Sequence, residues 1–188
     1  MGLSKEQLKT VETTIKNSLR NNFKAYTPEP AIMPFHTRLL GRDRLALYSF
    51  IHSLNTNFGT TIFEPVAVSL ASNRFKIAKH QVKSGSKISE QAQYEIQRIM
   101  DNLTAGNEKP DKEKEIEIIR KVCQKGEMRI VKPTKVDVYL ESPEGEIYLI
   151  DIKTAKPNKG GFKEFKRTLL EWCATVLSEN PQTKINTL

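Results

Sequence analysis

Three charged side chains in the last third of the sequence are spaced so that they can act together: Asp137, Asp151 and Lys153. Asp151 and Lys153 alternate with apolar residues in a run of strand periodicity, so both side chains point to one face. Residues 142–145, Ser-Pro-Glu-Gly, fit a type I turn followed by a left-handed glycine, which is a common hairpin loop with a bulge. The register of that loop, counted back along both strands, places Asp137 opposite Asp151.

Two carboxylates that face each other across a hairpin need a compensating cation, because like charges at about 4.5–5.5 Å are destabilising. Mg²⁺ prefers oxygen ligands, accepts only one or two protein carboxylates and completes its shell with water and substrate phosphates. Lys153 would then orient or help to deprotonate a water bound to the metal, and it could balance the charge of a phosphate that is to be cut. The alternative is that both aspartates are solvated edge residues and that Lys153 is only an ion-pair partner. The apolar run 147–152 argues against an exposed edge.

The elements that must position these residues follow from the periodicity of the whole sequence. Helices are predicted over residues 4–23, 43–58, 61–72, 88–103, 111–125 and 162–179, and strands over 136–140, 146–153 and 184–188. Ser4 with Gln7, and Thr61 with Glu64, form capping-box patterns, and Gly59 is expected to end the second helix. The core face of the last helix is expected to hold Phe162, Phe165, Leu169, Trp172, Cys173, Val176 and Leu177. This order predicts an α/β fold in which a helical N-terminal half precedes a small mixed β-sheet flanked by helices.

Composition narrows the class of protein. The chain has 188 residues, a net charge of +8 and no apolar run that approaches a membrane span, so we expect no membrane partner. Two cysteines cannot form a disulfide framework and indicate reduced thiols in a cytoplasmic compartment. The three histidines have no partner at ligand spacing, which argues against a zinc site or a histidine nuclease.

Positive charge gathers in two segments, residues 73–87 and 153–167. The first has five basic residues and no acid, and the second has six basic residues against Glu164 alone. Two solvated basic faces and two phosphate-binding faces are equally good interpretations until another observation separates them.

An acid, a hairpin, and then Asp151-Ile-Lys153 followed by an amphipathic helix resemble the active-site pattern of the PD-(D/E)XK nuclease superfamily. Members of this superfamily often add a glutamate from a helix before the hairpin. The start of the helix at residues 59–67 is similar to that element, which implies that Glu64 completes the metal site. Glu64 is alternatively only the capping partner of Thr61.

The segments 149–158 and 160–167 are similar to the TdeIII-type restriction endonucleases, and the resemblance runs from about residue 59 to the end. It implies a restriction-endonuclease-like core at residues 59–188. Outside that core, we expect the helical region at residues 1–58 to serve in dimerisation or DNA contact. The resemblance also implies a type II, Mg²⁺-dependent enzyme that cuts double-stranded DNA at a short palindrome such as GGNCC, and a homodimer to match the two-fold site. Family chains continue past the strand at 184–188, so the resemblance leaves open an incomplete, inactive core.

The resemblance assigns a role to the charged residues. Asp137, Asp151, the Ile152 carbonyl and Glu64 would bind metal, and Lys153 would position the nucleophile. DNA contacts are expected from Lys156, Asn158, Lys159, Lys163, Arg167, Arg74, Lys76 and Lys79, with Gln93 as a further candidate. The rival functions are a non-catalytic nucleic-acid-binding module and a repair or junction-resolving nuclease on the same fold.

Overall fold

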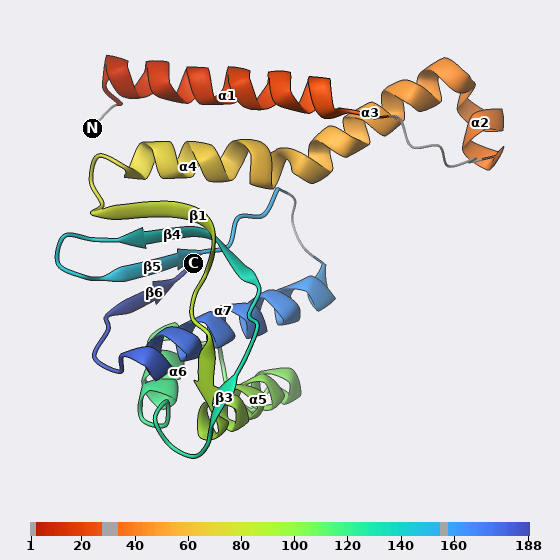
Figure 1. Cartoon of the computed structure of the whole chain (residues 1–188). Coiled ribbons are helices and arrows are strands. Elements are labelled where there is room, and N and C mark those ends of the chain that lie inside the picture. Colours follow the sequence, from red (N-terminus) through yellow and green to blue (C-terminus); the bar gives the residue numbers. More distant parts are fainter. Residues whose placement is uncertain (1–2, 28–33, 155–157) are drawn as a thin grey trace. The chain divides into compact units, whose positions relative to one another are not determined.

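The chain divides into two compact units, Met1–Leu70 and Ala71–Leu188 (Figure 1). The first unit is helical and the second contains the sheet, which confirms the predicted fold class. None of the helices in the described ranges is long and apolar enough to cross a membrane. The computed structural model describes residues 3–27, 34–154 and 158–188.

Helices form the described part of the first unit. They are α1 (Lys5–Ala25), α2 (Pro34–Leu40), α3 (Arg42–Phe58), a π-helical segment η1 (Gly59–Phe63) and α4 (Glu64–Ala71). The predicted capping box at the start of α1 is confirmed: the Ser4 hydroxyl accepts the Gln7 N–H, and the Gln7 side chain accepts the Ser4 N–H. The ring of Phe50 contacts Phe23 and Tyr26, which packs α3 against the end of α1.

The predicted helix break at Gly59 and the capping box at Thr61 are wrong. Gly59 keeps right-handed helical angles, and the Thr61 hydroxyl donates a hydrogen bond of 2.8 Å to the Asn57 carbonyl instead of capping a new helix. The Glu64 N–H bonds to the Gly59 carbonyl, five residues back. The cause is Pro65, which has no N–H and whose ring would clash with a carbonyl in a normal α-helical turn. A wider π turn makes room for the ring and lets the helix continue.

The second unit is built on a four-stranded sheet in the order β1-β4-β5-β6. Its strands are β1 (Ile77–Lys83), β4 (Lys135–Glu141), β5 (Ile147–Ile150) and β6 (Ile185–Thr187). The β1–β4 and β4–β5 pairs are antiparallel and the β5–β6 pair is parallel, so the sheet is mixed as predicted. The apolar strand β5 lies between β4 and β6, which confirms its expected interior position.

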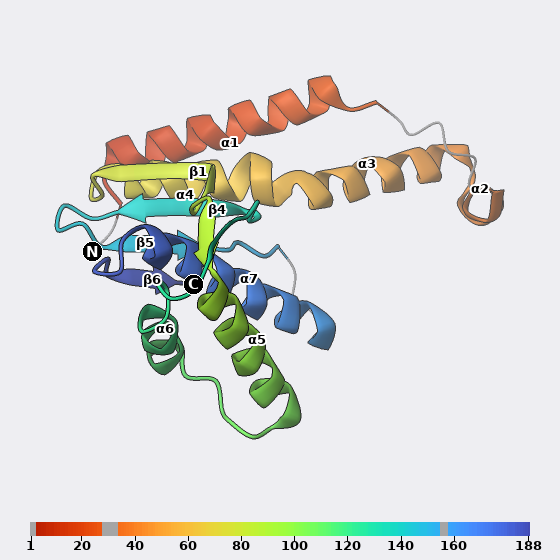
Figure 2. The ribbon, with the colours of Figure 1, turned by 60° about the horizontal axis from the view of Figure 1, so that its bottom comes forward.

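A second, two-stranded sheet and three helices complete this unit. They are β2 (Lys87–Ser89), β3 (Met128–Ile130), α5 (Glu90–Ala105), α6 (Lys112–Arg120) and α7 (Lys159–Glu179). Helix α7 packs against both α5 and α6 (Figure 2). Residue 88 was expected at the start of a helix but lies in β2, and α6 ends five residues before the predicted 125.

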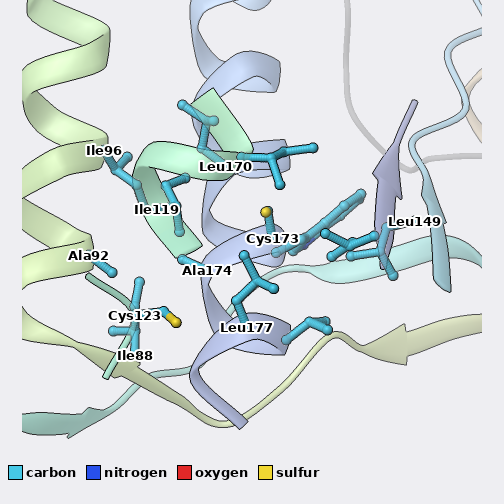
Figure 3. Packing of buried hydrophobic residues seen from close by; sticks show 14 of the residues in the cluster. Ile88, Ala92, Ile96, Ile119, Cys123, Leu149, Leu170, Cys173, Ala174 and Leu177 are labelled. Atoms are coloured by element: carbon cyan, nitrogen blue, oxygen red, sulfur yellow. The ribbon is translucent and has the colours of Figure 1, made fainter. Parts of the chain in front are cut away.

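The hydrophobic core lies around α7, where Cys173 and Leu177 are buried together with residues of α5, α6 and the sheet (Figure 3). Trp172 belongs to the same buried cluster. The Trp172 indole donates to the Thr134 carbonyl at 2.9 Å, so its polar atom is satisfied. Burial raises the pKa of the Cys173 thiol to about 12, which makes it unreactive as expected. The predicted core face is wrong at its start, because Phe162 is exposed and the first turns of α7 are only partly covered.

Candidate active site

The hairpin between β4 and β5 has the predicted register. The Ser142 N–H donates to the Glu146 carbonyl at 2.9 Å, and Gly145 has the expected positive φ of 83°. Val138 pairs with Ile150. Val138 follows Asp137 in the sequence, and Ile150 precedes Asp151. Asp137 therefore stands opposite Asp151 at the open end of the hairpin.

The Asp137 carboxylate is held by two donors. Its Oδ2 atom accepts the Ile152 N–H at 2.8 Å, and its Oδ1 atom lies 3.5 Å from the side-chain amide nitrogen of Gln81. The contact with Ile152 joins Asp137 on β4 to the segment that follows β5. These donors hold the Asp137 carboxylate in place.

Asp151 follows directly after β5, which ends at Ile150 and not at residue 153 as predicted. Its N–H donates to the Leu188 carbonyl at 2.8 Å, which fixes its backbone beside the end of β6. The Lys153 ammonium lies 2.5 Å from the Asp151 Oδ1 atom and 4.2 Å from the centre of the Phe165 ring. Phe165 was expected in the core, but it is half-buried and supports Lys153 by a cation–π contact.

The alternative interpretation of these residues is confirmed in one part only. Lys153 does form an ion pair with Asp151. An exposed edge position is excluded, because Asp151 extends from an interior strand and its side chain is only 10% exposed. The Lys153 side chain is 37% exposed, so solvent reaches the lysine more than the aspartate.

The donor set fits a hard divalent cation. Two carboxylates and a backbone carbonyl at Ile152 are oxygen ligands, and Mg²⁺ needs no more than one or two carboxylates from the protein. In the described part of the chain no three His, Cys, Asp or Glu side chains gather into a metal-binding group. Glu64 is buried and belongs to the first unit, and its role as a further ligand stays a prediction.

Gln81 is the site residue that the sequence did not suggest. It lies in β1 with a φ of 55°, between the pairs His80–Val138 and Val82–Val136, and so at the level of Asp137. A residue other than glycine rarely adopts this conformation, and such strain gathers at functional sites. The segment 77–83 is basic and has no strand periodicity, so the sequence carried no signal for this contact.

We expect Gln81→Asn to lower the rate of DNA cleavage by about tenfold with little change in thermal stability. Asparagine tolerates positive φ well, so the backbone is kept, but its amide is one methylene too short to reach Asp137. Cleavage rates and thermal unfolding of the same preparations check this result. A Gln81→Asn protein with the wild-type rate would exclude a positioning role for this amide.

The residues predicted to bind DNA have several different environments. Asn158 caps α7 by accepting the Gly161 N–H at 2.8 Å, so its side chain is already occupied. Lys76 forms an ion pair of 2.9 Å with Glu141, which compensates its charge. Arg74, Lys79 and Lys163 are exposed. Lys156 and the side chain of Lys159 lie outside the described residues.

Arg167 and Gln93 line one cavity of about 350 Å³ between α5, α7 and the chain that leads into β4. The Arg167 guanidinium donates to the Gln97 side-chain oxygen at 2.6 Å. Glu171 lines the same cavity, and its burial raises the pKa of the carboxyl group despite the opposing effect of Arg167. Arg167 therefore has an internal role beside its predicted contact with DNA.

Comparison with known proteins adds to this geometry. A family model described as "Type II restriction endonuclease, HinfI" matches residues 3–188. The type II restriction enzyme MjaII of Methanocaldococcus jannaschii is 25% identical in an alignment of 203 residues. The alignment covers 98% of this chain and 53% of that protein. The chain thus spans about half the length of this curated relative. No solved structure matches.

Proposed function

The chain belongs to the HinfI family of type II restriction endonucleases, and on this premise we propose that it hydrolyses phosphodiester bonds of double-stranded DNA at a specific site with Mg²⁺. The observation that carries the proposal is the hairpin register, which sets Asp137 opposite Asp151 with Lys153 beside them. One lysine balances one of the two carboxylate charges, and a purely DNA-binding role gives no reason to place an acidic pair where DNA would approach.

In the proposed reaction water attacks phosphorus in line and the 3′-oxygen leaves. Mg²⁺ would supply a Lewis acid that stabilises charge on the phosphate and makes water more acidic. Asp137 and Asp151 would hold the ion with the Ile152 carbonyl, while Gln81 and the Ile152 N–H keep the Asp137 carboxylate in place. Lys153, supported by Phe165, orients the water and balances the phosphate charge.

Finer features of the enzyme also belong to this proposal. We place the site in the PD-(D/E)XK superfamily on its acid, acid-x-Lys pattern, and keep Glu64 as a third acid. The similarity to TdeIII-type enzymes supports GGNCC as the first recognition sequence to test, although the matched family carries the HinfI name. A palindromic site has two-fold symmetry and each chain carries one catalytic site, which favours a homodimer. Residues 1–58 would form the dimer contact or a further DNA contact.

Incubation of supercoiled plasmid with the protein and Mg²⁺, beside an EDTA control, tests the proposal directly. We expect discrete fragments with Mg²⁺ only, and mapping of their ends gives the recognition sequence and the cut position. Nicking or a smear would favour a repair or junction-resolving nuclease on the same fold. A mobility shift of DNA without any cutting would favour the non-catalytic binding module.

A further inference from the structure

Two lysines face each other where β1 ends and β4 begins. Lys83 and Lys135 are a directly opposed cross-strand pair, and both are exposed. Like charges at this distance destabilise a sheet. Among the described residues neither lysine forms an ion pair or a hydrogen bond through its side chain. Neither lysine therefore has an ion-pair partner within the described part of the chain, and the Glu179 carboxylate at the end of α7 accepts the Ser86 N–H at 3.2 Å instead.

The same ribbon continues with positive charge. The segments 83–87 and 130–135 run side by side, because the Val131 N–H donates to the Ser86 carbonyl at 2.9 Å and Lys87 pairs with Ile130. They contain no acidic residue, and Lys87 and Lys132 are exposed as well. Four lysines, Lys83, Lys87, Lys132 and Lys135, thus form what we call the ribbon lysines.

The lysine pair adjoins the acidic pair on one face of the sheet. Lys135 precedes Asp137 by two residues on β4, so their side chains share a face and their Cα atoms are about 7 Å apart. Lys83 stands directly opposite Lys135 in the β1–β4 pair and so shares this face. The acidic pair Asp137 and Asp151, which suits a cation, thus has the basic pair Lys83 and Lys135, which suits an anion, as its neighbour on the sheet.

We propose that Lys83 and Lys135 bind a phosphate of the DNA strand next to the one that is cut, and that Lys87 and Lys132 extend this contact along the backbone. The inference rests on the proposed function, since it requires DNA at the hairpin site. A phosphate between the two lysines relieves their repulsion, so DNA compensates what the fold leaves uncompensated. The contact gives affinity and register but no sequence preference.

The test is binding of a fluorescein-labelled 30-base-pair duplex, in EDTA, to the double variant Lys83→Gln/Lys135→Gln. We expect about tenfold weaker binding, as for the loss of a charge-assisted hydrogen bond, and a salt slope lower by about 0.9. The loss should be equal for duplexes of different sequence. Thermal stability without DNA should stay the same or rise, because repulsion across the ribbon is removed.

The matched control is Lys121→Gln/Lys125→Gln, which removes the same two charges from exposed lysines beyond the end of α6. Equal weakening in both double variants would mean that only net charge matters and would overturn the proposal. Lys83→Arg/Lys135→Arg keeps the charges, and binding that it does not retain would also contradict a phosphate contact. If the ribbon variant is less stable, this arginine variant decides the question.

A second measurement locates the phosphate after the cut has been mapped. Each phosphate near the cut is replaced in turn by an uncharged methylphosphonate, and binding is compared between the wild type and the glutamine variant. We expect one position next to the cut at which the replacement weakens only the wild type. An equal effect in both proteins at every position would overturn the assignment. Failure of the wild type to bind or cut any duplex would instead refute the proposed function.

Discussion

Asp151→Asn is expected to abolish Mg²⁺-dependent cleavage, with a rate at least about 10³-fold below that of the wild type, while binding to DNA survives or tightens. The Asp151 side chain extends from an interior strand and is one of two opposed carboxylates. Its amide analogue therefore removes half of the negative charge that is proposed to bind the metal ion. The same change removes a negative charge from the surface that DNA approaches, which favours the complex. Single-turnover cleavage of plasmid and equilibrium binding in EDTA measure the two effects on one preparation.

Glu144→Gln is the matched control for this experiment, because Glu144 lies in the exposed turn of the same hairpin and its change removes the same charge. It should leave the cleavage rate within about twofold of the wild type. Retained cleavage by Asp151→Asn would remove the hairpin from the active site altogether. Loss of DNA binding together with cleavage, at unchanged thermal stability, would assign Asp151 to recognition and not to metal binding.

The hairpin site could be predicted from sequence because local rules decide it. A glycine at the left-handed position of the 142–145 turn selects one loop type, and that loop selects one register for both strands. The apolar run after the turn then required an interior strand, which is where β5 lies. No contact distant in sequence was needed to place Asp137 opposite Asp151.

Contacts that depend on distant segments could not be predicted in this way. Strand β1 pairs with β4 across more than fifty residues and has the composition of a surface segment, so Gln81 and the Lys83–Lys135 pair were not visible as site features. The predicted helix break at Gly59 failed for a different reason. Glycine and a capping-box pattern both indicated a break, but Pro65 is accommodated by a local π turn that neither signal contains.

Lys153→Ala is expected to reduce turnover by roughly 10²–10³-fold while the Mg²⁺ concentration needed for half-maximal cleavage stays the same or falls. The ammonium is 2.5 Å from an Asp151 oxygen, so it competes with a metal ion for that carboxylate and repels it. Its removal therefore frees the ligand at the same time as it removes the group that orients the water. Cleavage rates over a Mg²⁺ titration separate the two effects.

Phe165→Leu provides the partner experiment, because it keeps Lys153 and its ion pair but removes the ring 4.2 Å from the ammonium. A cation–π contact at a partly exposed site is worth about 0.5–1 kcal/mol, so we expect a loss in rate of about two- to fivefold and no change in the Mg²⁺ requirement. A higher Mg²⁺ requirement in Lys153→Ala would contradict the assigned role, since it would make the lysine a support for metal binding. Equal losses in both variants would show that the position of the ammonium, and not only its presence, controls the chemical step.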